Sequence, residues 1–164
     1  MTYVHVYFTS GSSVHLRSSA ENNSNNVITE LPYGYTIAYD YTISPFKHVL
    51  VNDGIDVIEG FVHENYLTAS NIQCSEDKKW MPRYSTTAWK RTTHYNKYYL
   101  PVKRIQQDLY NLGYTQVGTP DGYYGNNTEN AVKAFQSAYG LTSDGIFGTN
   151  SKKKLWSLTP HASL

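Results

Sequence analysis

Two carboxylates, Asp121 and Asp144, stand in the same short phrase of this 164-residue chain and are the acids best placed to do chemistry. Cleavage of a glycan needs two carboxylates in different roles, one as the acid and the other as the base or nucleophile. Because the two phrases are equivalent, they predict one shared role for both acids. We expect each carboxylate to bind backbone N–H groups of its own turn.

The histidines and the cysteine form no motif that is typical of a metal site or a nucleophile. The sequence has no His-Glu-x-x-His, Cys-x-x-Cys or Gly-x-Ser-x-Gly pattern. The lone Cys74 cannot form an internal disulfide. We therefore expect no catalytic residue, no metal and no cofactor. The histidines are His5, His15, His48, His63, His94 and His161.

The repeated phrase predicts two turns that each lead into a helix. Its copies, 121–128 and 144–151, start 23 residues apart. In each copy the first glycine is free to adopt a positive φ and the second ends the turn. Thr128 and Ser151 are placed to cap the helices that follow. The expected structural turn residues are Asp121, Gly122, Gly125, Asp144, Gly145 and Gly148.

Helical periodicity surrounds these turns. Val102, Ile105, Leu109 and Leu112 recur at helical spacing, which predicts an amphipathic helix with Pro101 in its first turn and Gly113 at its end. A second helix is predicted through Ala131–Ala138. A third, shorter helix carries Leu155 and Trp156 as apolar anchors. The order of turns and helices indicates a small duplicated helical unit.

These patterns together resemble the bacterial peptidoglycan-binding domain, type 1, a three-helix module. The resemblance covers 102–156 and lies in Val-x-x-Ile-Gln-x-x-Leu, Leu-Gly-Tyr, Ala-Val-x-x-Phe-Gln and the two Asp-Gly-x-x-Gly phrases. It implies bacterial peptidoglycan as the ligand. The departure is the entry segment 90–101, which is rich in tyrosine where the family commonly has glycine and serine.

The first half of the chain has the pattern of short β-strands. Strands are expected at 3–8, 14–17, 35–41, 48–51 and 59–62, with a turn at Asp53-Gly54. This density of strands predicts a small barrel. The phrases 14–18, 27–34 and 60–67 resemble a bacterial SH3-like domain (SH3b, type 3). The predicted fold class is therefore two-domain, all-β and then all-α.

We expect domain boundaries at two composition shifts. Residues 1–70 are predicted to form the SH3-like β-barrel domain, and the polar segment 71–79 the linker. The helical domain is predicted to span 80–164, with the aromatic residues of 80–84 and 87–89 packing against it as a lead-in.

Composition narrows the partners. The net charge of +1 gives no indication of nucleic acid binding, and no apolar run is long enough to span a membrane. No charged-then-apolar signal precedes Met1-Thr2-Tyr3. We expect a location at the cell wall or outside the cell. The protein could be encoded by a phage, be released by lysis, or depend on a secretion signal that this sequence does not include.

The 16 tyrosines predict a binding surface, because a tyrosine offers a flat apolar face with a polar tip to sugar rings and peptide stems. In the helical half the candidates surround the first repeated turn: Tyr114, Tyr123, Tyr124, Asn126 and Asn127. In the SH3-like half they are Tyr33, Tyr35, Tyr39 and Tyr41. The alternation of Tyr35, Tyr39 and Tyr41 predicts one strand face, which could equally be core.

The leading interpretation is a non-catalytic protein, or targeting fragment of an endolysin or autolysin, with two peptidoglycan-binding modules in tandem. Two weak sites gain affinity on a polymer of repeating epitopes. One alternative is a regulatory subunit that contacts a partner wall hydrolase. Another is a peptidoglycan hydrolase itself.

Overall fold

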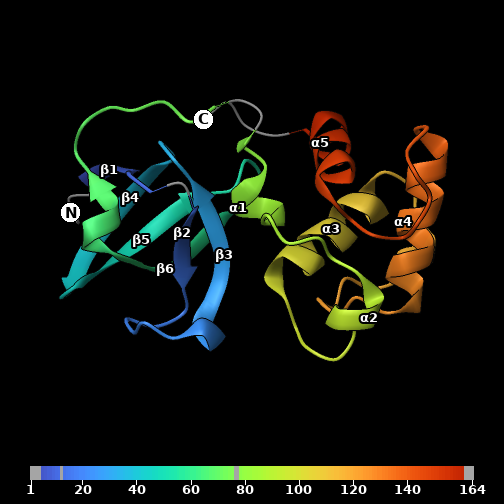
Figure 1. Cartoon of the computed structure of the whole chain (residues 1–164), viewed down its shortest axis with the longest axis horizontal. Helices are drawn as coiled ribbons and strands as arrows, with labels where there is room; N and C mark the ends of the chain where they lie inside the picture. Colours follow the sequence, from blue (N-terminus) through green and yellow to red (C-terminus); the bar gives the residue numbers. More distant parts are fainter. Residues whose placement is uncertain (1–4, 12, 76–77, 161–164) are drawn as a thin grey trace. The chain divides into compact units, whose positions relative to one another are not determined.

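The chain divides into two compact units, one ending at Ser85 and the other spanning Thr86–Pro160. This computed structural model describes residues 5–11, 13–75 and 78–160 (Figure 1). The expected first strand began at Tyr3, so its first two residues lie outside the described part.

The first unit is an antiparallel sheet of seven strands in the order β3-β2-β6-β5-β4-β1-β7 (Figure 1). The pairings do not close on themselves among the described strands. The structure thus establishes an antiparallel sheet, and the SH3-like barrel stays a prediction. The strands are β1 (His5–Thr9), β2 (Ser13–Arg17), β3 (Val27–Pro32), β4 (Thr36–Ile43), β5 (Phe46–Asn52), β6 (Val57–His63) and β7 (Leu67–Thr68).

The strand predictions near 14–17, 35–41, 48–51 and 59–62 are confirmed to within a few residues. The Asp53-Gly54 turn is also confirmed, since it joins β5 to β6 with a Gly54 φ of +100°. Apolar side chains that alternate along the strands form the core. Its fully buried members include Leu16, Leu31, Ile37, Val49, Val51 and Val62.

The predicted single tyrosine face on β4 is wrong because of a bulge. Tyr39 lies opposite Val49, whereas Tyr41 lies opposite His48, with a register shift between the two tyrosines. Consecutive residues of β5 point to opposite sides of the sheet, so Tyr39 and Tyr41 do as well. Tyr35 precedes the strand and belongs to the core, where its hydroxyl donates to the Asn52 carbonyl at 2.6 Å.

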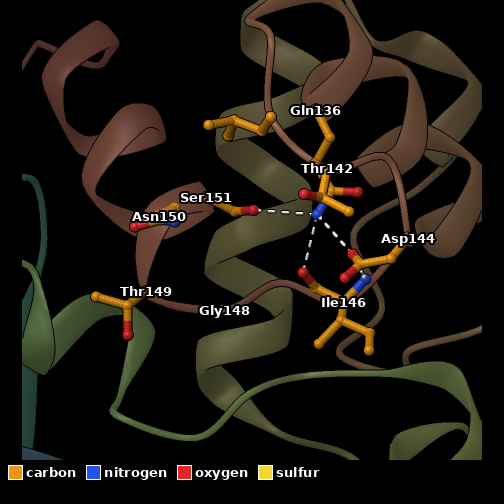
Figure 2. Close-up of a pocket in the computed structure, with 9 residues that line it drawn as sticks. Gln136, Thr142, Asp144, Ile146, Gly148, Thr149, Asn150 and Ser151 are labelled. Carbon is orange, nitrogen blue, oxygen red and sulfur yellow. Dashed lines mark hydrogen bonds between the residues drawn. The ribbon is translucent and has the colours of Figure 1, made fainter.

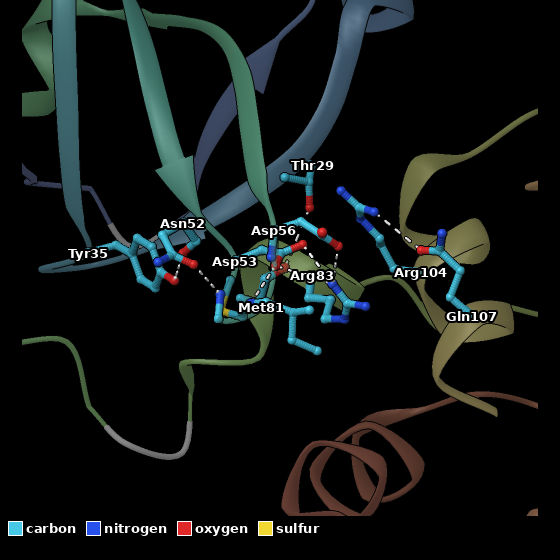
Figure 3. Close-up of polar contacts among 11 residues, drawn as sticks. Thr29, Tyr35, Asn52, Asp53, Asp56, Met81, Arg83, Arg104 and Gln107 are labelled. Carbon is cyan, nitrogen blue, oxygen red and sulfur yellow. Dashed lines mark hydrogen bonds and ion pairs between the residues drawn. The ribbon is translucent and has the colours of Figure 1, made fainter. Parts of the chain in front are cut away.

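A buried ion pair holds the short helix α1 (Met81–Tyr84) in the first unit (Figure 3). The Arg83 guanidinium is 2% exposed and lies 3.0 Å from a carboxylate oxygen of the fully buried Asp53. Arg83 also lies 3.3 Å from Asp56, and Thr29 on β3 donates to the Met81 carbonyl at 3.5 Å. Residues 80–84, expected to belong to the helical half, thus lie within the strand unit, because the counter-ions of Arg83 belong to the β5–β6 turn.

The predicted linker is not a free tether along its whole length. A Cβ atom added at Gly34, whose φ is +75°, would lie 2.7 Å from the carbonyl carbon of Gln73. Backbone of the segment 71–74 thus packs closely on the turn before β4. Cys74, in the same segment, is half-buried.

The second unit consists of three longer helices and two short ones. Helix α3 (Leu100–Asn111) has Pro101 in its first turn and ends before Gly113, whose φ is +97°, as predicted. Helices α4 (Asn126–Ala138) and α5 (Thr149–Leu158) follow the two repeated turns. No helix in the described part of the chain is both long and apolar enough to cross a membrane. The buried side chains include Val102, Ile105, Leu109, Val132, Phe135, Phe147, Leu155 and Trp156.

An aromatic segment leads into α3. Trp89 exchanges backbone hydrogen bonds with Phe147, so the predicted packing of 87–89 against the helical half is confirmed for Trp89. The ring of His94, at the end of α2 (Arg91–His94), lies 4.8 Å from Trp89 and 5.3 Å from Tyr99. Burial among these rings lowers the pKa of His94 below its ordinary value of 6.5.

We predict that Asp53→Asn lowers the free energy of unfolding of the strand unit by about 3 kcal/mol, because the variant leaves the buried Arg83 charge poorly compensated. Asp56→Asn is the matched control, since its carboxylate is 43% exposed, and should cost under about 1 kcal/mol. Urea unfolding of the whole chain, followed through hydrogen exchange of the strand amides, measures both. Equal losses would contradict a dominant role for the buried pair.

We also predict a pH dependence of stability from His94. The pKa of His94 is lower in the folded chain than in the unfolded chain. As the pH falls below about 6.5, the unfolded chain therefore binds more protons than the folded chain. The free energy of unfolding decreases over this range until the pH has passed the folded pKa. His94→Gln should flatten this part of the stability curve. An NMR titration of the His94 ring checks the assignment, and a midpoint at or above 6.5 would refute it.

Candidate functional site

The carboxamide of Gln106, on α3, is buried against the first repeated turn. Its Oε1 accepts the backbone N–H groups of Asp121 at 2.9 Å and Gly122 at 2.8 Å. Its Nε2 donates to the Asp121 carboxylate, the Tyr123 carbonyl and the Thr128 hydroxyl at 2.8 to 3.0 Å. One buried amide therefore satisfies both donors and acceptors of the turn.

Gln136, on α4, makes a similar arrangement at the second turn, where the Asp144 N–H donates instead to the Thr142 carbonyl at 3.0 Å (Figure 2). Its Oε1 accepts the Gly145 N–H at 2.9 Å. Its Nε2 donates to the Asp144 carboxylate at 3.1 Å, the Ile146 carbonyl at 2.9 Å and the Ser151 hydroxyl at 3.2 Å. The duplication seen in the sequence is thus a duplication of hydrogen bonding.

The repeated acids are turn formers, as predicted. The Asp121 carboxylate accepts the Tyr123 N–H at 3.0 Å, and that of Asp144 accepts the Ile146 N–H at 2.8 Å. The glycine after each acid has a positive φ, +82° at Gly122 and +73° at Gly145. Since Oδ1 of each carboxylate accepts from its own turn and from a glutamine, the two acids have equivalent structural roles.

The predicted helix caps are wrong. The N-cap residues are Gly125 and Gly148, and no side chain caps either helix. Thr128 and Ser151 lie in the first helical turn, where their buried hydroxyls accept from Gln106 and Gln136. Each is the third residue of its helix, so neither occupies the position before the first helical residue from which a side chain caps a helix.

A pocket opens beside each glutamine, at the start of the following helix. The first has a volume of about 390 Å³ and the second about 260 Å³. Equivalent positions of the repeat line both, including the glutamine, the aspartate and the first turn of the helix (Figure 2). The repeat therefore produces two related pockets in one small unit.

Three of the five helical candidates meet at the first pocket, namely Tyr123, Asn126 and Asn127. Tyr124 does not, because its ring is fully buried and its hydroxyl donates to the Gly145 carbonyl at 2.8 Å. Tyr114 packs edge-on against Phe135, with ring centres 5.8 Å apart, and does not line the pocket. Tyr123 and Tyr124 are neighbours in the chain, yet only Tyr123 lines the pocket.

The four candidates in the strand unit do not form one site. Tyr33 and Tyr41 are exposed, whereas Tyr35 belongs to the core. Tyr41 stacks on His48 at 4.6 Å, and Tyr39 lies beneath the Lys47 ammonium at 4.3 Å. Tyr35 is therefore withdrawn as a ligand contact, and the other three stay predictions.

Tyr98 is a residue of the first site that the sequence interpretation missed. Its ring lies 6.4 Å from that of Tyr123, and the two are 46% and 42% exposed. A Cβ atom at Gly122 would come within 2.4 Å of the Tyr98 ring, so the ring rests on the turn itself. Gln106 and Gln136 were also missed as turn partners, although each follows a Val-x-x-Ile or Val-x-x-Phe step that could have revealed them.

The two pockets differ at their rims. Tyr123 and Asn126 of the first site correspond to Ile146 and Thr149 of the second. The first pocket thus offers an aromatic ring and two carboxamides, which are groups that bind sugars and peptides. Within the described residues, no group of three or more histidine, cysteine, aspartate or glutamate side chains could hold a metal ion.

We predict that Gln106→Leu destabilises the helical unit by about 3 kcal/mol, because it leaves the buried Gly122 N–H and the part-buried Asp121 N–H without their acceptor. Gln107→Leu is the matched control, as the adjacent glutamine accepts a hydrogen bond from Arg104 at 3.2 Å and should change stability by less than about 0.5 kcal/mol. Urea unfolding of the whole chain measures both variants. A cost for Gln106→Leu no larger than the control's would show that the turn does not depend on the amide.

Residues 100–155 match the family described as "Putative peptidoglycan binding domain". A curated relative from Bacillus licheniformis, "Probable N-acetylmuramoyl-L-alanine amidase", is 60% identical over 38 residues, which are 23% of this chain and 11% of the amidase. N-acetylmuramoyl-L-alanine amidase CwlM from Mycobacterium tuberculosis is 37% identical over 62 residues, which are 38% of this chain and 15% of CwlM. The matched stretch is thus a small part of each amidase.

A solved peptidoglycan-binding protein from Clostridioides difficile, in complex with glutamine hydroxamate, is 24% identical, with a TM-score of 0.38. The match covers 84% of this chain and 66% of that protein, and it is too distant to add to the assignment. The family match, in contrast, coincides with the predicted range 102–156. The chain therefore contains a peptidoglycan-binding module at residues 100–155.

Proposed function

We propose that the chain binds peptidoglycan through the first pocket of the helical unit. The observation that carries this proposal is the gathering of Tyr123, Asn126 and Asn127 around one pocket within the peptidoglycan-binding module. Tyr98, beside Tyr123, extends the same surface.

The chemistry of the pocket suits a neutral N-acetylated sugar. Asp121 is the one charged residue that lines it, and its carboxylate is already bound to Gln106 and to the Tyr123 N–H. The exposed rings of Tyr98 and Tyr123 offer apolar faces to a sugar ring. The carboxamides of Asn126 and Asn127 can donate to and accept from hydroxyl and N-acetyl groups. The glycine N-cap of α4 leaves backbone donors of the first helical turn without a side-chain cap.

For the strand unit we propose an SH3-like domain that serves as a second wall-binding module, with Tyr33, Tyr39 and Tyr41 as candidate contacts. Its support is the antiparallel sheet of short strands together with the SH3-like phrases of the sequence. We propose that this domain extends to Ser85 and that the helical domain begins at Thr86, following the two compact units. Two modules on one chain would raise affinity for a polymer through effective concentration.

We further propose that the chain acts without catalysis, at the cell wall, as a targeting module that accompanies a wall hydrolase. The repeated acids support this, because both are bound within equivalent turns instead of flanking one bond. A suspension of intact sacculi should therefore stay turbid when the chain binds to it. Clearing of the suspension would overturn the non-catalytic part of this proposal.

We predict that the double variant Tyr123→Ala, Asn127→Ala weakens co-sedimentation of the whole chain with sacculi about tenfold or more, since it removes a stacking face and a carboxamide. The variant should keep its fold, because both side chains lie at the surface of the turn. The measurement is the fraction of protein pelleted as the amount of sacculi is increased.

The matched control changes the same positions of the second repeat, Ile146→Ala with Asn150→Ala. Ile146 is exposed to nearly the same extent as Tyr123, so general effects of truncation are alike. We expect this control to pellet like the unchanged chain. Equal losses in both double variants, or no loss in either, would contradict a site at the first turn.

A further inference from the structure

A separate pocket of about 280 Å³ lies in the strand unit, where β2 meets the start of β5 and the end of β6. It is independent of the tyrosines on β4. The residues that matter for its chemistry are His15, Arg17, Asn22, Phe46, His63 and Tyr66.

The charge of this pocket comes from Arg17, which is 9% exposed. The guanidinium donates to the Asn23 carbonyl and, at 2.9 Å, to the side-chain oxygens of Asn22 and Asn26. It also lies 3.2 Å from Nδ1 of His15. None of the four partner atoms is a carboxylate oxygen. Within the described residues, Arg17 is therefore a largely buried cation that no carboxylate neutralises.

A buried charge is costly unless an opposite charge or many hydrogen bonds compensate it. The Glu30 carboxylate lies 3.9 Å from Nε2 of His15, the histidine that contacts Arg17. Because both Nη groups of Arg17 already donate to these four atoms, a carboxylate ligand would meet the charge of the guanidinium and its Nε–H group. The electrostatics of the pocket thus favour a ligand that brings a carboxylate.

The other walls are apolar and aromatic. The Phe46 ring lies 5.2 Å from that of His63, which lies 5.9 Å from that of Tyr66. His63 accepts the Asn65 N–H at Nδ1, which fixes its ring at the edge of the pocket. The fully buried side chain of Val14 completes an apolar surface that suits small methyl groups.

We propose that this pocket binds the C-terminal carboxylate of a short wall peptide whose side chains are small and apolar, with Arg17 as the carboxylate-binding residue. The choice of a wall peptide rests on the proposed function of the chain. The pocket would give the strand unit a ligand different from the neutral sugar proposed for the helical unit. Two modules would then read two chemical components of the same polymer.

The test is an NMR titration of the whole chain with D-alanyl-D-alanine. Backbone amides of Arg17, His63 and Asn65 should shift, with a dissociation constant on the order of 1 mM, as is usual for one ion pair in an open pocket. D-alanyl-D-alaninamide, which lacks the terminal charge, should cause no such shifts. Inorganic phosphate distinguishes a peptide carboxylate from anions in general.

Asn22→Asp neutralises Arg17 without changing the shape of the site, because it puts a carboxylate oxygen where the Asn22 oxygen already accepts from the guanidinium. It should weaken dipeptide binding about tenfold or more. Asn23→Asp is the matched control, since it adds the same charge one residue away, where the side chain accepts the Asn25 N–H instead. This control should retain binding to within about twofold.

Three results would overturn the proposal: no shifts with the dipeptide, equal shifts with its amide or with phosphate, or equal weakening by the two aspartate variants. Co-sedimentation with sacculi is measured on the same samples. Retained pelleting without a dipeptide response would overturn the pocket assignment alone. Loss of both would overturn the proposed function as well.

Discussion

The helical unit depends on a buried carboxamide that it uses twice. A tight turn through Asp-Gly points its backbone N–H groups inward, where water does not reach them. Gln106 and Gln136 meet these groups from the preceding helices and also bind the hydroxyl in the first turn of the following helix. Each amide thus ties a helix, a turn and the next helix together. Because an amide has both donors and an acceptor, no apolar side chain of similar size could replace it.

This constraint explains why the two sites share the residues that close the turn, while the side chains at the rims of their pockets differ. The glutamine, the aspartate and the glycine with positive φ are all needed to close the turn. The residue two positions after the aspartate contributes only its backbone to the frame, so Tyr123 and Ile146 can occupy equivalent places. The two copies of the repeat therefore share the glutamine, the aspartate and the glycine of the turn, and they differ in the side chains that line the pocket.

Two arginines in the strand unit show two ways of burying one charge. Arg83 lies against Asp53 and Asp56, and this pairing attaches helix α1 to the sheet. Arg17 lies among amide oxygens and a histidine nitrogen. Carboxylates neutralise the first charge, whereas uncharged oxygens only solvate the second. A structural role accounts for Arg83, and an unneutralised charge beside a pocket is what distinguishes Arg17.

The sequence alone determined the features that local backbone preferences control. The Asp-Gly turns, the helix end at Gly113 and the strands around the Asp53-Gly54 turn follow from the φ angles that glycine permits and from the spacing of apolar residues. Tertiary structure decided which side chain faces which surroundings. A bulge separated Tyr39 from Tyr41, and a buried ion pair placed α1 with the strands. Packing put Tyr124 in the core and Tyr123 at the pocket, because their environments come from residues far away in the chain.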